Sequence, residues 1–266
     1  MKDKIQSLLG PQYPWKDLLE YLPETDSTND RLKALAKSGA PHGTVLIADR
    51  QTGGRGRNGR SFLSPEGMGV YLSMLLRPQC TAMELMHLTC AVAVAMCDAV
   101  EAAAGFRPGI KWTNDLVFGK QKLGGILTEL SLGAGGLADF AVVGIGINCR
   151  QRPEDFPEAL REIACSLSAA AGREVCPEVL AANMMQALYH MDQTLLTGKD
   201  TMMARYRSDC VTIGKDICLL RPGAPVEHGR ALDVDDSGAL VVAFSDGRVE
   251  AVNSGEVSVR GMYHYV

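Results

Sequence analysis

A ten-residue segment, QTGGRGRNGR at positions 51–60, contains four glycines and three arginines. Glycine lets backbone amides approach a phosphate closely, and an arginine guanidinium matches phosphate oxygens with parallel hydrogen bonds. The segment therefore predicts a mobile loop that binds an anionic ligand, although a solvated basic turn would have a similar composition. Gly54, Gly56 and Gly59 also fit the dinucleotide pattern G-x-G-x-x-G. The residues after them, however, predict loop and strand where that motif requires a helix.

A lysine, an amide and a carboxylate lie close together in Ile110–Leu116 (IKWTNDL). If this segment is a strand, Lys111 and Asp115 share one of its faces. Trp112 and Asn114 then share the other. A carboxylate beside a phosphate-binding loop is a candidate ligand for Mg²⁺, whereas a strand end with an Asn-Asp turn would explain the segment without any ligand.

Two further strand-like segments are interrupted by glycines, at Lys122–Glu129 (KLGGILTE) and Val143–Asn148 (VGIGIN). Strand interiors avoid glycine unless another backbone or a ligand comes close. Lys122 stands just before the first glycine pair, so it is a candidate contact to that ligand. The alternatives are an ordinary turn lysine and a tightly packed sheet centre.

The apolar periodicity predicts the elements that position these segments. Ser27 or Thr28 is expected to cap a helix that follows residues 23–29. Strands are expected at 44–49, 69–77, 110–118, 122–132 and 140–148, and further helices at 83–104 and 178–196. From Val211 onward, short alternating runs separated by turns predict a small β-barrel. We therefore expect two domains, 1–210 and 211–266.

The composition bears on the partners and the cell compartment. The chain has 266 residues, 46% of them hydrophobic, and a net charge of −4, which gives no electrostatic reason to expect nucleic acid or a membrane surface as partner. The N-terminus lacks an apolar segment of signal-peptide length, and the apolar run Leu88–Val100 is expected to be a buried helix. Eight cysteines without a C-x-x-C pair predict reduced, mostly buried thiols in a cytoplasmic protein.

Taken together, the segments resemble the successive motifs of biotin–protein ligases, in order and at similar spacing. The matching motifs are DSTN (26–29), QTGGRGRNGR (51–60), KWTND (111–115), KLGGILTE (122–129) and GIGIN (144–148). The resemblance implies an α+β fold: a class II synthetase-like mixed sheet with flanking helices, followed by a small SH3-like barrel. It also implies an ATP-dependent ligase that forms biotinyl-5′-AMP and passes biotin to a lysine of a biotin carboxyl carrier protein. A lipoate or octanoate ligase or transferase of the same fold, and a non-catalytic biotin-binding protein, are the alternatives.

The resemblance also assigns roles to individual residues. Lys122, Arg55 and Arg57 are expected to be catalytic, and Asp115 to hold Mg²⁺. The residues expected to contact biotin are Ser27, Thr28, Asn29, Gln51, Arg55, Gly56, Arg57, Lys122, Gly125 and Gly144. Those expected to contact ATP or the adenylate are Gly54, Arg57, Arg60, Phe62, Asn114, Asp115, Lys122, Asn148 and Arg260.

The sequence departs from the family pattern at three positions. Thr113 stands where proline is usual, Asn58 where arginine is common, and Phe62 where tryptophan is common. Only 25 residues precede Asp26, which is too few for the DNA-binding domain of ligases that also act as repressors, so no repressor role is expected. The sequence leaves open whether the protein is a monomer or a homodimer.

Overall fold

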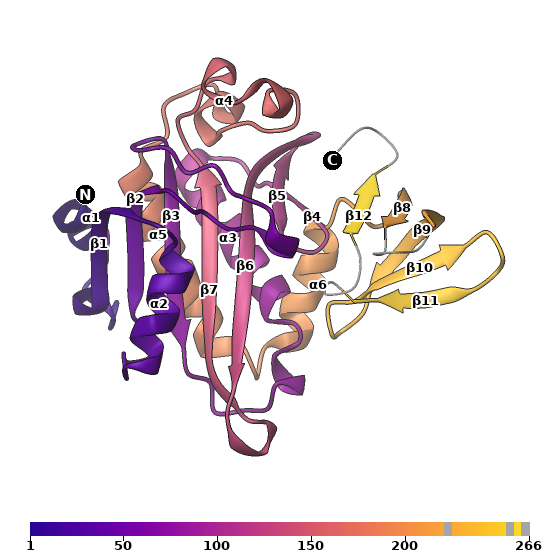
Figure 1. The fold of residues 1–266 in the computed structure, drawn as a ribbon, viewed down its shortest axis with the longest axis horizontal. Helices are drawn as coiled ribbons and strands as arrows, with labels where there is room; N and C mark the ends of the chain where they lie inside the picture. Colours follow the sequence, from indigo (N-terminus) through magenta and orange to yellow (C-terminus); the bar gives the residue numbers. More distant parts are fainter. Residues whose placement is uncertain (221–224, 254–257, 262–266) are drawn as a thin grey trace.

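The computed structural model of the protein describes residues 1–220 and 225–253, together with the backbone of 258–261 (Figure 1). Its larger sheet has seven strands in the order β1-β2-β3-β7-β6-β5-β4, with β1 and β2 parallel and the other neighbours antiparallel. These strands are β1 Leu19–Thr25, β2 Val45–Gln51, β3 Gly69–Leu76, β4 Gly109–Lys111, β5 Asp115–Phe118, β6 Gln121–Leu132 and β7 Ala138–Asn148.

A second, antiparallel sheet follows in the C-terminal part of the chain, with the order β11-β10-β9-β8-β12. Its strands are β8 Asp216–Leu220, β9 Glu227–Val234, β10 Leu240–Phe244, β11 Val249–Val252 and β12 Ser258–Gly261. The α-helices are α1 Lys2–Leu8, α2 Thr28–Lys37, α3 Leu88–Ala104, α4 Leu167–Ala171, α5 Pro177–Thr194 and α6 Lys199–Asp209. A mixed sheet with flanking helices and a separate small β unit confirms the expected fold class.

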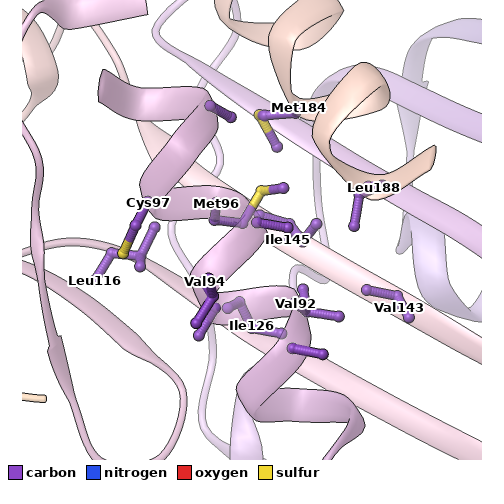
Figure 2. Packing of buried hydrophobic residues seen from close by; sticks show 14 of the residues in the cluster. Val92, Val94, Met96, Cys97, Leu116, Ile126, Val143, Ile145, Met184 and Leu188 are labelled. Carbon is purple, nitrogen blue, oxygen red and sulfur yellow. The ribbon is translucent and has the colours of Figure 1, made fainter. Parts of the chain in front are cut away.

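The two faces of the large sheet are covered by different helices (Figure 1). Because side chains alternate along a strand, neighbouring residues of β7 belong to different cores. Val142 packs with α2, whereas Val143 and Ile145 belong to the main core with α3 and α5. Figure 2 shows Met96 of α3 and Leu188 of α5 beside these two β7 residues.

Helix α3 is the apolar centre of that main core. The segment Met83–Ala104, which includes α3, is the one segment of the described chain that is long and apolar enough to cross a membrane, and it is mostly buried inside the protein. The expectation of a buried helix at Leu88–Val100 is thereby confirmed. Its start was predicted too early, because Met83–Leu85 forms a separate 3₁₀ turn before the buried His87.

The segment 110–118 is two strands joined by a turn, so the prediction of a single strand there was wrong. Lys111 on β4 pairs with Asp115 on β5 across an antiparallel hairpin, and the three residues between them form the turn. The side-chain alternation expected for one strand is therefore lost at this point. Lys111, Trp112, Asn114 and Asp115 all line one cavity, and the Trp112 indole also reaches toward the second sheet.

Trp112 connects the two sheets. Its indole Nε1 donates a hydrogen bond of 2.9 Å to the carbonyl oxygen of Gly238, in the turn between β9 and β10. Its backbone N–H donates to Thr212 Oγ1, also at 2.9 Å. Buried residues of the second sheet, such as Leu219 and Val242, belong to the same continuous core as α3. The C-terminal strands therefore pack directly against the elements that build the cavity.

Candidate active site

A cavity lies on the face of the large sheet that carries α2, beside the first turn of that helix and beneath the loop 51–62. Helix α2 covers only one end of this face, through its contacts with β2, β3 and β7 (Figure 1). The predicted site residues that line the cavity are Ser27, Thr28, Asn29, Gln51, Arg55, Gly56, Arg57, Arg60, Phe62, Asn114, Asp115, Lys122, Gly125 and Gly144. Residues from three distant parts of the sequence are thus brought to one place.

Glycines in the central strands make room for the cavity. On β7, a methyl group added to Gly144 would lie 2.0 Å from Asn29 Oδ1, and one added to Gly146 would lie 2.5 Å from the ring of Phe62. Both distances are far below van der Waals contact. The two glycines of β7 therefore leave the space that the side chains of Asn29 and Phe62 occupy in the cavity wall. The close approach is between parts of the protein, a possibility that the sequence left open.

The cavity floor beside α2 is made of neutral polar groups. Ser27 is the N-cap of α2, and its Oγ accepts from the backbone N–H of Asp30. Gln51 Oε1 accepts from both the backbone N–H and the hydroxyl of Thr28, at 2.9 and 3.0 Å, and its Nε2 donates to Ser64 Oγ. An amide nitrogen has two protons, so Gln51 keeps one N–H for a ligand. The Ser27 hydroxyl proton has no acceptor among the described residues.

The amide of Asn29 is held from both ends. Its Nδ2 donates to Glu129 Oε2 at 2.8 Å and to the carbonyl oxygen of Leu127 at 3.2 Å. Its Oδ1 lies 2.6 Å from Ser73 Oγ, a fully buried hydroxyl on β3. Because both amide protons are used, Asn29 can offer only an acceptor, the remaining lone pair of Oδ1, to the cavity.

The opposite wall of the cavity is cationic. Lys122 Nζ lies 2.6 Å from Asp115 Oδ1, across the β5–β6 pair. Arg57 donates to Asn114 Oδ1 at 2.9 Å, and Asn114 in turn donates to the carbonyl oxygen of Ile126 at 2.7 Å. Burial lowers the pKa of Arg57, because the charged guanidinium is partly removed from water.

Charge is strongly unbalanced within this cavity. The cationic side chains among its lining residues are Arg55, Arg57, Arg60, Lys111 and Lys122. Asp115 is the only carboxylate among the described residues that line it. An excess of four positive charges in a concave site of a protein with net charge −4 favours an anionic ligand.

The loop 51–62 is fixed over the cavity at separate points. Arg55 Nη1 donates to both carboxylate oxygens of Asp30 of α2, at 2.7 and 3.0 Å. Phe62, at the far end of the loop, packs over Gly146 and meets the ring of Tyr71 edge-on at 6.4 Å. Phe62 therefore provides the aromatic surface that tryptophan would provide in the family pattern.

Two predicted site residues, Gly54 and Asn148, do not line the cavity, and a third, Arg260, is described only in its backbone. Gly54 does not line the cavity, and an added methyl group would lie 2.4 Å from the carbonyl oxygen of Phe62, so it serves the packing of the loop. Asn148 is buried at the end of β7, where its amide bonds to Cys165 and Gln151. The backbone of Arg260, on β12, pairs with that of Cys218 on β8, but the Arg260 side chain lies outside the described residues.

Sequence reasoning missed the residues that hold the floor in place, namely Ser73 and Glu129. Each lies in an apolar strand segment and contacts Asn29 only through the tertiary fold. The signal that could have found Ser73 is its fully buried hydroxyl on the predicted strand 69–77, because a buried polar group requires a partner.

The donor set for Mg²⁺ is small. No group of three or more His, Cys, Asp or Glu side chains that could hold a metal occurs among the described residues. Asp115 offers one carboxylate, and Mg²⁺ accepts one or two carboxylates when substrate phosphates and water supply its other ligands. The cavity therefore fits Mg²⁺ that arrives with a nucleotide, and does not fit a resident metal ion.

Comparison with known proteins identifies the family. Residues 21–148 match the model of the Biotin/lipoate A/B protein ligase family, and residues 212–260 match that of the biotin protein ligase C terminal domain. The chain is 34% identical to the bifunctional ligase/repressor BirA of Bacillus subtilis, over 91% of this chain and 74% of that protein. It is 31% identical to the biotin–[acetyl-CoA-carboxylase] ligase of Mycobacterium tuberculosis, over 94% and 91% of the two chains.

A solved structure gives the same result. The biotin protein ligase of Aquifex aeolicus, in complex with biotin and ATP, superposes with a TM-score of 0.76 at 30% identity, covering 91% of this chain and 98% of that one. The relatives and the solved structure share one activity by name, and each extends over both sheets. The chain belongs to the biotin protein ligase family.

Proposed function

We propose that this protein joins biotin to ATP, forming biotinyl-5′-AMP and pyrophosphate, and then transfers biotin to a lysine of a biotin carboxyl carrier protein. One observation carries the proposal: a neutral polar floor and a cationic wall meet in a single cavity. Biotin has a neutral urea group at one end and a carboxylate at the other. The named activity of the relatives supports the same conclusion.

The hydrogen-bonding polarity of the floor complements a cyclic urea. Ser27 and Gln51 each have a proton to donate, and a urea oxygen can accept two hydrogen bonds. Asn29 Oδ1 has a lone pair to accept a urea N–H. The dithiolane ring of lipoate has no N–H and would leave this acceptor unpaired, so the floor favours biotin over the lipoate alternative.

The cationic wall suits the first chemical step. A carboxylate oxygen of biotin attacks the α-phosphorus of ATP, a new P–O bond forms, and the bond to pyrophosphate breaks. Like charges about 4 Å apart repel by about 4 kcal/mol per pair at an effective dielectric near 20. We assign the offset of this repulsion to Arg55, Arg57 and Lys122, which act as preorganised charges. Mg²⁺ bound with the nucleotide would add positive charge at the phosphates, with Asp115 as its protein ligand.

The loop 51–62 has a proposed role in the second step. Biotinyl-adenylate is a mixed anhydride, which water hydrolyses, so a loop that closes over it protects the intermediate. The acceptor amine then attacks the acyl carbon, the new amide bond forms, AMP leaves with the electrons of the broken C–O bond, and the nitrogen releases one proton to water. The proposed acceptor is a carrier protein; nucleic acid and membrane lipid are not proposed as partners.

Two assays test the proposal. Purified protein with biotin and MgATP should release pyrophosphate, and addition of a biotin carboxyl carrier domain should give a product with one biotinylated lysine. A protein that is stabilised by biotin against thermal unfolding but releases no pyrophosphate would be a biotin-binding protein without ligase activity. Stabilisation by lipoate and not by biotin would instead support the lipoate alternative.

A further inference from the structure

Glu129 contacts the cavity floor without lining the cavity itself. It lies on β6, on the same face as Gly125 and Leu127, because these three residues alternate along the strand. We propose that Glu129 is a positioning residue that fixes the orientation of the Asn29 amide and so makes the protein select ligands with a urea N–H. The inference rests on the proposed function, because it names what distinguishes biotin from related carboxylic acids at this site.

Two acceptors fix the orientation of the Asn29 amide. Two acceptors, Glu129 Oε2 and the Leu127 carbonyl oxygen, lie at 2.8 and 3.2 Å from Nδ2. A flipped amide would place its oxygen against both of these oxygens, which is unfavourable in a site where Asn29 is only 4% exposed. The Leu127 carbonyl is neutral and the more distant of the two, so the Glu129 carboxylate contributes the stronger preference.

Glu129 is itself held in place by a lysine. Its other oxygen, Oε1, lies 2.7 Å from Lys33 Nζ, and Lys33 also pairs with Asp30 at 2.8 Å. Partial burial opposes the charge on Lys33, but the hydrogen bonds to Asp30 and Glu129 outweigh it and raise the Lys33 pKa. One carboxylate oxygen is therefore engaged by a cation and the other is directed to Asn29.

Ion pairs of Asp30 link the floor to the loop. Asp30, which shares Lys33 with Glu129, also holds Arg55 of the loop 51–62. Ion pairs of this kind on a surface contribute little to stability, since the Glu129 side chain is 30% exposed and that of Asp30 is 37% exposed. Their effect is geometric: they fix which atoms face the ligand. This distinguishes a positioning role from a stabilising one.

The test compares three ligands in three proteins. Binding of biotin, and of biotin methylated on either ureido nitrogen, is measured by titration calorimetry for the wild type, Glu129→Gln and Glu129→Ala. In Glu129→Gln, Lys33 will attract the new amide oxygen, which turns the new NH₂ group toward Asn29 Nδ2. Both variants should bind biotin about tenfold or more weakly, the loss expected for one hydrogen bond in a buried site.

The ratio of the affinities for biotin and for the N-methyl isomers distinguishes a positioning role from a loss of stability. One N-methyl isomer should bind the wild type more weakly than biotin does. The variants should bind this isomer with nearly the wild-type affinity, so the ratio of biotin affinity to isomer affinity should fall by the same factor as the biotin affinity. A variant that was merely destabilised would lose affinity for both ligands equally. Glu174→Gln, which alters an exposed ion pair with Arg150, should keep the wild-type values.

The outcomes separate the two claims. If the wild type binds biotin and both Glu129 variants keep its discrimination, Glu129 is an ordinary surface carboxylate and the inference is overturned. If the wild type does not bind biotin at all, the proposed function fails. Glu129→Gln changes one atom type without changing the volume of the side chain, so it is the variant to use if Glu129→Ala fails to fold.

Discussion

The methyl group that Gly144 lacks would occupy the place of Asn29 Oδ1, at 2.0 Å. Gly144→Ala should therefore displace the Asn29 amide and weaken biotin binding by about tenfold or more, while the strand itself persists. Calorimetric titration with biotin is the measurement. Gly133→Ala is the matched control, because an added methyl group there meets nothing closer than 3.6 Å. Equal affinities for the two variants would contradict the packing described here.

We propose that Lys122, which lines the cavity, acts on the reacting carboxylate and phosphate. Lys122→Ala should slow adenylate formation by about 100-fold, the usual loss when one preorganised charge is removed. The side chain is 32% exposed and its partner Asp115 is 21% exposed, so the melting temperature should change little. Pyrophosphate exchange measures the rate, with Lys120→Ala as the control. A near-normal rate would make Lys122 an ordinary turn lysine.

The sequence predicted most of the residues in the cavity and few of the residues that hold them. Lys122 and Asp115 belong to short motifs whose chemistry can be read locally. Ser73 and Glu129 acquire their roles from contacts with Asn29 that span 44 and 100 positions in the chain. Such contacts follow from strand register, which no local pattern specifies.

Among the elements, the loop 51–62 has the clearest functional consequence. Arg57 reaches from the loop to Asn114 in the β4–β5 turn, so Arg57→Gly should open the loop and release biotinyl-adenylate into solution. Released adenylate would acylate lysines of an unrelated protein, such as serum albumin, even if its synthesis continued. The control is Arg152→Gly, at an exposed arginine outside the cavity. Bystander labelling no greater than that of the wild type would show that Arg57 does not hold the loop closed.

Strand β1 and helix α6 could not be predicted from the sequence, because neither has apolar residues at the spacing of a strand or a helix with one buried face. Strand β1 contains Pro23 and two glutamates, and among the described strands it pairs with β2 alone, as expected for an edge strand. In helix α6 only Met203 and Tyr206 are buried, too few to make an apolar stripe. The strongly apolar elements, α3 and β7, were predicted within a few residues.

The turn before β10 places the second sheet against α3. Gly238 has φ +89°, and an added methyl group would lie 2.9 Å from Cys90 Sγ. Gly238→Ala should lower the free energy of unfolding by about 1–3 kcal/mol, measured by urea denaturation. Gly247→Ala is an informative control, because Gly247 has φ +88° with nothing near the added methyl group. Equal losses would mean that backbone strain alone accounts for the effect.

At the scale of the whole molecule, the accessibility of the cysteine thiols to a reagent measures how well the core is packed. Six of the eight cysteines are buried, and only Cys176 and Cys218 are partly accessible. Burial raises the pKa of Cys90 to about 12 and that of Cys165 to about 11, so these thiols stay protonated at neutral pH. Iodoacetamide at about pH 8 should label two cysteines of the folded protein and eight of the unfolded protein, as counted by mass spectrometry. A third label on the folded protein would contradict the packing.

The charge imbalance of the cavity also bears on how a nucleotide arrives. The cavity lining carries an excess of four positive charges in a chain of net charge −4, so the rest of the chain carries −8. A nucleotide still far from the protein is repelled, and only near the cavity is it attracted. Salt screens charges beyond about 10 Å at 0.1 M, so it weakens the distant repulsion before the local attraction. Moderate ionic strength should thus speed nucleotide capture, whereas a uniformly basic binding surface would lose speed.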